Sequence, residues 1–158
     1  MGRVMRQMSL RFFLALILMS SLPALTEEAV VEYDYAGSGT RWLESDKIDV
    51  KFKVLVEASN LGGSEVEVAE IFIPPNYEGA AHVHGLEIFY ILDGELHHIV
   101  NGETNVLTPG MIGIVRAPDK VIHKVPESGL RALLIWPGGG EIGPIAEAWT
   151  VRPIGSQD

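Results

Sequence analysis

From residue 47 to residue 137 the chain is a succession of short apolar runs separated by turn residues, and no run has a helical period. In residues 48–56 every second side chain is apolar and the residues between are mostly charged, which is the pattern of a half-buried strand. Eight or more runs of this kind follow one another, with turn residues about every 8–12 positions. This spacing is typical of an antiparallel sandwich or barrel, so the sequence predicts an all-β domain.

Length and composition exclude several classes of protein. The chain has 158 residues, enough for one domain with its own core, and 47% of its residues are apolar, which excludes a disordered chain. Cysteine is absent, so disulfides, thiolate metal sites and cysteine nucleophiles are excluded. The formal net charge of -9 argues against nucleic acid as a partner.

Residues 1–26 have the plan of a secretory signal peptide. Arg3, Arg6 and Arg11 precede a short apolar run, and small or polar residues follow it up to Thr26. Cleavage there would remove three positive charges and no acidic residue, which takes the net charge from -9 to -12. We therefore expect a secreted or periplasmic acidic domain without stable membrane association after cleavage. The alternative is an uncleaved N-terminal membrane anchor, since the signal alone does not decide between them.

After this segment we predict three parts: an N-terminal extension over 27–46, a β-barrel over 47–137 and a C-terminal tail over 138–158. The barrel contains two hairpin signals, Asp93-Gly94 and Asn101-Gly102. The glycine-rich stretch that opens the tail is interpreted as a linker, because it lacks the strand-to-helix context of a phosphate-binding loop. The tail is expected to hold at most one short helix or strand.

The stretch AHVHGLE places His82, His84 and Glu87 within six positions. If Gly85-Leu86 is a two-residue turn, Glu87 lies across from His84 and Phe89 across from His82, all on one face of a hairpin. Two imidazoles and one carboxylate on one face suit Fe(II), Mn(II), Ni(II) or Zn(II). The alternative is a polar rim, because the same histidine spacing also occurs in exposed strands.

Two motifs give this stretch a resemblance to a known family. His84 and Glu87 are separated by two residues, Glu87 and Gly94 by six, and a second stretch runs Pro118-x-Lys120, with two residues between Lys120 and His123. Over residues 48–136 the chain resembles the cupin superfamily, whose small barrels are double-stranded β-helices of the jelly-roll type. The resemblance implies that His82, His84, Glu87 and His123 are metal ligands.

Three positions depart from the cupin motifs. Asn76 stands where the first motif has glycine, a position that asparagine tolerates because it adopts the left-handed backbone conformation. Lys120 and Glu127 replace a glycine and an asparagine of the second motif, which makes His123 the least secure ligand.

Further residues of the predicted barrel are candidates for the pocket or the core. By alternation from Gly94, His98 faces inward, where it would serve as a donor to the metal ligands or as a general acid or base, or would cap the barrel mouth without a role. Four other side chains, Phe89, Tyr90, Met111 and Trp136, are interpreted as core residues, although Tyr90 points away from Glu87 by parity.

The fold does not determine the reaction. The resemblance favours an Fe- or Mn-dependent dioxygenase of the quercetinase type, acting on a small-molecule substrate, with Glu87 as ligand or base. Zn, Ni or Cu are alternative metals. A redox-neutral isomerase or lyase, with Glu87 or His98 moving a proton, and a non-catalytic binding protein remain alternatives. The edge strands and the stretch VVEYDY at residues 30–35 are also compatible with a homodimer.

Overall fold

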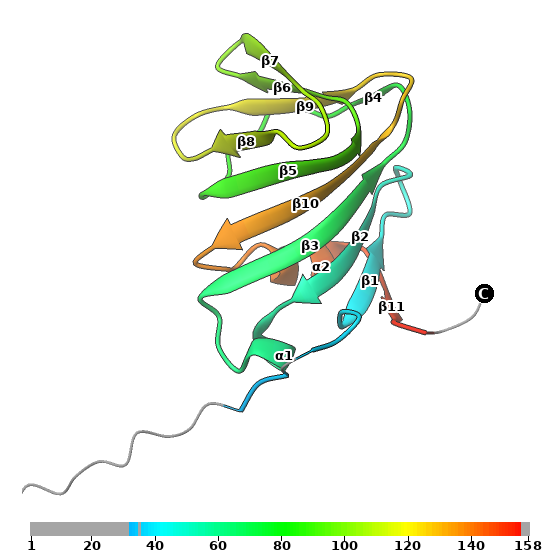
Figure 1. Cartoon of the computed structure of the whole chain (residues 1–158), viewed down its shortest axis with the longest axis vertical. Coiled ribbons are helices and arrows are strands. Elements are labelled where there is room, and N and C mark those ends of the chain that lie inside the picture. Colours follow the sequence, from blue (N-terminus) through cyan, green and yellow to red (C-terminus); the bar gives the residue numbers. More distant parts are fainter. Residues whose placement is uncertain (1–31, 35, 156–158) are drawn as a thin grey trace, which may run out of the picture. The chain divides into compact units, whose positions relative to one another are not determined.

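Two antiparallel sheets make up the protein in a computed structural model that describes residues 32–34 and 36–155 (Figure 1). The larger sheet has the strand order β11–β1–β2–β3–β10–β5–β8, and the smaller has the order β4–β9–β6–β7. The strands are β1 (Arg41–Glu44), β2 (Lys51–Val56), β3 (Val66–Ile73), β4 (Tyr77–Glu78), β5 (Glu87–Gly94), β6 (Leu96–Val100), β7 (Glu103–Leu107), β8 (Ile112–Val115), β9 (Val121–Val125), β10 (Leu130–Pro137) and β11 (Thr150–Pro153). The helices are α1 (Ala58–Leu61) and α2 (Ile142–Ala148). The predicted all-β class is confirmed, and the predicted signal peptide lies outside the described residues.

One hydrophobic core joins the inward faces of the two sheets. Phe52, Phe89 and Trp136 enter it from the larger sheet, and Leu96 and Val125 enter it from the smaller one. The alternation of each strand produces this arrangement, because every second side chain of β2, β5 and β10 faces the partner sheet.

The core assignments of four large side chains are partly confirmed. Phe89 and Trp136 are 1% and 2% exposed and belong to the core. Tyr90 and Met111 are 39% and 44% exposed, so their assignment to the core was wrong. Tyr90 occupies the outward position of β5 that its parity predicts, and Met111 lies in the turn that precedes β8. Exposure thus follows strand parity and turn position rather than the size of the side chain.

The larger sheet extends past the predicted barrel boundaries at 47 and 137. β1 lies in the predicted N-terminal extension and pairs with both β2 and β11, and β11 lies in the predicted tail. Arg152 of β11 donates a hydrogen bond to Glu44 of β1 at 2.8 Å, which adds a charge-assisted contact to the pairing. Both strands have only four residues, too few to show a clear alternation in the sequence.

Only one of the two predicted hairpins is present. Asn101-Gly102 joins β6 to β7 with φ values of 50° and 87°, as a tight primed turn requires. At Asp93-Gly94 the chain instead passes from β5 in the larger sheet to β6 in the smaller one, so the hairpin predicted there is wrong. A glycine is still required, since a Cβ atom on Gly94 would collide with the carbonyl oxygen of Gly129.

Two helices accompany the sheets. The four residues of α1 follow β2 directly, and the seven residues of α2 connect β10 to β11. These are the two helices of residues 32–34 and 36–155. Neither is long and apolar enough to cross a membrane.

Candidate metal centre

Four predicted ligands are brought together by both sheets. His82 and His84 lie between β4 and β5, Glu87 is the first residue of β5, and His123 is the middle residue of β9. The predicted hairpin over residues 82–89 is wrong, because His82 forms an isolated bridge with Val121 of the β9 strand rather than pairing with Phe89. Residues 79–86 carry the chain from the smaller sheet to the larger one, so the ligands converge across the sheets.

The side chains of these four residues face one another at short range. His84 Nε2 lies 3.5 Å from Glu87 Oε2, and His123 Nε2 lies 3.8 Å from Glu87 Oε1. The centroid of the His82 ring lies 4.5 Å from that of the His84 ring and 5.3 Å from that of the His123 ring. With metal–ligand bonds of about 2.1 Å, neighbouring ligand atoms are about 3.0–3.4 Å apart. The described side chains do not yet form a group of three or more donors that could hold a cation. Shortening the two distances to the Glu87 oxygens by a few tenths of an ångström would bring them into this range.

Two buried atoms of this cluster test whether its residues fit a metal ion. Glu87 Oε1 and His123 Nε2 have no hydrogen-bond partner, although Glu87 is 2% exposed and His123 is 7% exposed. A buried polar atom left in this state costs about 1–3 kcal/mol. The two atoms face each other, and a divalent cation between them would satisfy both. The donor set therefore fits a divalent transition metal.

Neighbouring groups orient two of the ligands. Trp136 Nε1 donates a 2.8 Å hydrogen bond to Glu87 Oε2, which leaves Oε1 free to face His123. His82 Nδ1 lies 2.8 Å from the carbonyl oxygen of Ala80. Because a carbonyl oxygen only accepts, Nδ1 must carry the proton, and the lone pair of His82 is then on Nε2. Hydrogen bonds of this kind fix the ring orientation and tautomer of metal-binding histidines.

Burial perturbs the protonation of the cluster. Desolvation raises the pKa of Glu87 to about 7, against the opposing effect of the Trp136 hydrogen bond. Desolvation, together with the nearby His98, His82 and His84 rings, lowers the pKa of His123 to about 3. The pKa of His84 is also lowered, first by burial and then by His82. Above about pH 7 the ionised carboxylate of Glu87 therefore lies beside the neutral imidazoles of His84 and His123, the forms that bind metals.

The raised pKa of Glu87 predicts a metal affinity that depends on pH. Below about pH 7 the metal-free carboxyl group holds a proton that must leave before a cation binds, whereas above about pH 7 it is already ionised. We expect the apparent association constant to fall about fivefold from pH 7 to about pH 6, as for release of one proton from a group with a pKa of about 7, and to level off above about pH 8. Metal titrations across this range measure it. In Glu87→Gln, the metal affinity that remains should no longer fall with pH in this way. An unchanged pH dependence in the variant would assign the released proton to another group.

His98 lies behind the cluster rather than in it. It is buried in β6, and its ring stacks on His123 with centroids 5.4 Å apart and an interplanar angle of 17°. Its Nε2 lies 3.4 Å from the carbonyl oxygen of Ile114, and its Nδ1 has no hydrogen-bond partner. The inward orientation predicted from parity is present, but His98 is not among the residues that line the cavity beside the four ligands.

That cavity has a volume of about 170 Å³ and is mainly apolar. All four predicted ligands line it, together with apolar and aromatic side chains from both sheets and from the C-terminal segment. The sequence analysis missed Tyr77, Ile145 and Trp149, which also line it. Ile145 and Trp149 are four residues apart, a helical spacing that places both on one face and could have identified them.

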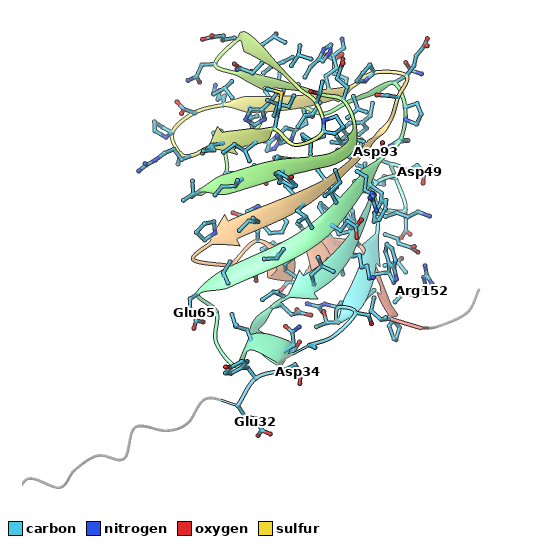
Figure 2. The ribbon with its side chains drawn as sticks, viewed as in Figure 1. Glu32, Asp34, Asp49, Glu65, Asp93 and Arg152 are labelled. Atoms are coloured by element: carbon cyan, nitrogen blue, oxygen red, sulfur yellow. The ribbon has the colours of Figure 1, made fainter. Side chains whose placement is uncertain are left out.

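A second hollow of about 560 Å³ is larger but has no comparable cluster of metal-binding side chains. Asp49 and Asp93, two of its lining residues, are labelled in Figure 2, and Trp42 and Arg131 also line it. None of the four predicted ligands lies there. We therefore take the smaller cavity as the candidate site, since all four predicted ligands line it and two of them have buried atoms without partners.

Comparison with known proteins finds similarity in structure. No protein-family model matches the chain, and no curated protein does either. An RmlC-like cupin from Shewanella frigidimarina is 23% identical with a TM-score of 0.58, over 71% of this chain and 96% of that one. KdgF from a Halomonas species is 13% identical with a TM-score of 0.55, over 64% and 91%. The polyketide cyclase RemF from Streptomyces resistomycificus is 17% identical with a TM-score of 0.52, over 69% and 73%. At these identities the similarity is one of fold.

Proposed function

The chain has the cupin fold, and from this premise we propose that the protein is a metal-dependent oxidoreductase of the dioxygenase type that acts on a small organic molecule. The observation that carries the proposal is the meeting of three imidazoles and one carboxylate with a mainly apolar cavity. Fe(II) or Mn(II) suits this donor set, with Zn(II), Ni(II) or Cu(II) as alternatives. When bound, the metal supplies an open coordination position and the redox chemistry of O₂.

In this proposal His82, His84, Glu87 and His123 hold the metal. When it is not coordinated, Glu87 can also hold or take up a proton, because the pKa of the metal-free carboxyl group is about 7. His98 acts through its stacking on His123 and fixes the orientation of that ring, since it does not line the cavity. Its role is then positioning rather than direct acid or base catalysis.

The cavity wall restricts the substrate. Phe52, Ile71 and Leu134 form an apolar surface on the side of the larger sheet, and the polar groups are concentrated at the histidine cluster. A substrate that fits has an apolar body and one polar group directed at the cluster. The volume of about 170 Å³ is below the roughly 300–1,000 Å³ of pockets for drug-sized ligands, so the molecule is small.

The test is oxygen uptake by the chain loaded with Fe(II) or Mn(II), with a set of small apolar molecules that each carry one enol, catechol or carboxylate group. We expect uptake with at least one of them, and loss of that uptake in Glu87→Gln. Binding of these molecules without oxygen uptake would contradict the dioxygenase proposal.

A redox-neutral isomerase or lyase is the second candidate. The observation that favours it is the pKa of Glu87, which lies at about 7 without metal and suits proton transfer near neutral pH whenever this carboxyl group is not coordinated. Zn(II) in the protein as isolated, with no oxygen uptake after loading with iron or manganese, would support this candidate over the first. We further propose that the protein acts in a secreted or periplasmic location, in accordance with the signal-peptide pattern of residues 1–26.

A further inference from the structure

The segment that follows β10 covers the cavity. Ile145 and Trp149 line it from the C-terminal side, and the Trp149 ring lies 5.2 Å from that of Phe52 in β2. Ile142, the first residue of α2, is 1% exposed and belongs to the core. Part of the cavity wall is thus formed by α2 and the residue that follows it, not by the sheets.

The start of this cover is held by hydrogen bonds to β3 and is preceded by three glycines. Glu67 Oε2 of β3 accepts hydrogen bonds from the backbone N–H groups of Glu141 and Ile142, at 2.8 Å and 2.9 Å. The three residues before them are glycines with φ values of 92°, 64° and 91°, conformations that other residues rarely adopt. Docking therefore depends on these hydrogen bonds together with burial of Ile142 in the core.

One of these contacts reaches the metal ligands. The carboxylate of Glu141 places Oε2 3.6 Å from Nδ1 of His84, while Nε2 of the same ring faces Glu87 Oε2 at 3.5 Å. His84 therefore lies between two carboxylates, one at each ring nitrogen. A carboxylate that accepts the Nδ1 proton leaves the lone pair of the ring on Nε2, the nitrogen that faces the cluster.

We propose that Glu141 is a positioning residue that orients His84 for metal binding and thereby couples occupation of the metal site to docking of α2 over the cavity. The proposal rests on the metal site of the proposed function. If Glu141 contacts His84 only when α2 is docked, docking raises the affinity for metal, and by reciprocity metal binding stabilises the docked segment by the same factor. Undocking would remove Ile145 and Trp149 from the wall and open a route for substrate entry.

The first test compares the metal affinity of the full chain with that of Glu141→Ala, by titration with Co(II) in competition with a chromophoric chelator. Loss of a carboxylate partner of a metal-binding histidine weakens metal affinity by about 10–100-fold, and we expect this loss here. Glu141→Gln should recover part of it, because an amide oxygen can also accept the Nδ1 proton. Glu147→Ala is the matched control, since Glu147 is an exposed acidic residue of the same helix.

The second test measures hydrogen exchange of residues 138–149 with and without Co(II). Metal is expected to slow exchange there in the full chain and in Glu147→Ala, but not in Glu141→Ala at a Co(II) concentration that saturates it. Equal affinities in Glu141→Ala and the full chain, or equal protection by metal in both, would overturn the positioning role. Absence of Co(II) binding by the full chain itself would instead refute the metal site, so the two failures are distinguishable.

Discussion

Replacing both His82 and His84 with alanine is expected to abolish metal binding, from about one ion per chain to none. The two substitutions remove two of the four donors and leave Glu87 and His123, which cannot hold a transition metal against water and buffer. The loss should exceed the roughly 10–100-fold effect of removing a group that only orients a ligand. Elemental analysis of the full chain and the variant, purified without a histidine tag and after equal exposure to Fe(II), Mn(II) and Zn(II), measures the difference.

The matched control is His97→Ala. His97 is next to His98 in β6, but its Nε2 contacts Glu95 at 2.9 Å and it is not among the residues that line the cavity. This variant should bind as much metal as the unmodified chain. Equal metal content in the double variant and the unmodified chain would place the metal elsewhere, and absence of metal from both after reconstitution would refute the metal centre.

Removing the metal is expected to lower the thermal stability of the protein. In the metal-free form Glu87 Oε1 and His123 Nε2 are buried without partners, and a bound cation satisfies both. A ligand present at about 100 times its dissociation constant stabilises the folded state by about 2.7 kcal/mol. For a chain of this size that corresponds to a rise in Tm of roughly 5–10 °C. Thermal unfolding with a chelator and with excess metal, followed by circular dichroism, measures it.

Two variants isolate the source of this stabilisation. The His82→Ala/His84→Ala protein should show no change of Tm with metal, and a shift of equal size there would indicate binding at another place. Glu87→Gln tests the metal-free state. Because the folded pKa of Glu87 is raised to about 7, the cost of its ionisation develops as pH rises from about 4.5 to about 7 and is fully present above that. At pH 8 with a chelator, the Gln variant should therefore be at least as stable as the unmodified chain.

The ligand cluster was predictable although the local geometry used to predict it was wrong. His82, His84 and Glu87 are close in sequence, so any compact path between two strands keeps them near each other. The predicted hairpin is absent because residues 79–86 connect two different sheets. The sheet that each flanking strand joins depends on its pairing with β9 or β10, which lie 34 or more residues later. Parity, in contrast, is a local property of a strand, and it correctly oriented His98 and Tyr90.

The cover of the cavity could not be predicted in the same way. Trp149 and Ile145 show a helical spacing, but the cavity that they line is formed by strands far away in sequence. The contact between Glu141 and His84 joins residues 57 positions apart, and neither a motif nor a periodicity marks it. Asn76 is a case in which sequence reasoning succeeded, because its φ of 59° is the left-handed conformation expected where the cupin motif has glycine.

The pairing of β11 with β1 has a consequence for how proteins of this fold diversify. After α2 the covering segment continues into β11, which pairs with β1 at the edge of the larger sheet, and before α2 it is preceded by the glycine stretch of residues 138–140. The four proposed ligands lie within residues 82–123, so the ligands and the cover occupy separate stretches of the gene product, with Glu141 as the contact between them. Substitution of Ile145 or Trp149 can therefore change the cavity wall while leaving the ligands and Glu141 untouched. Substitution of Glu141, in contrast, would change the cover and the metal site together.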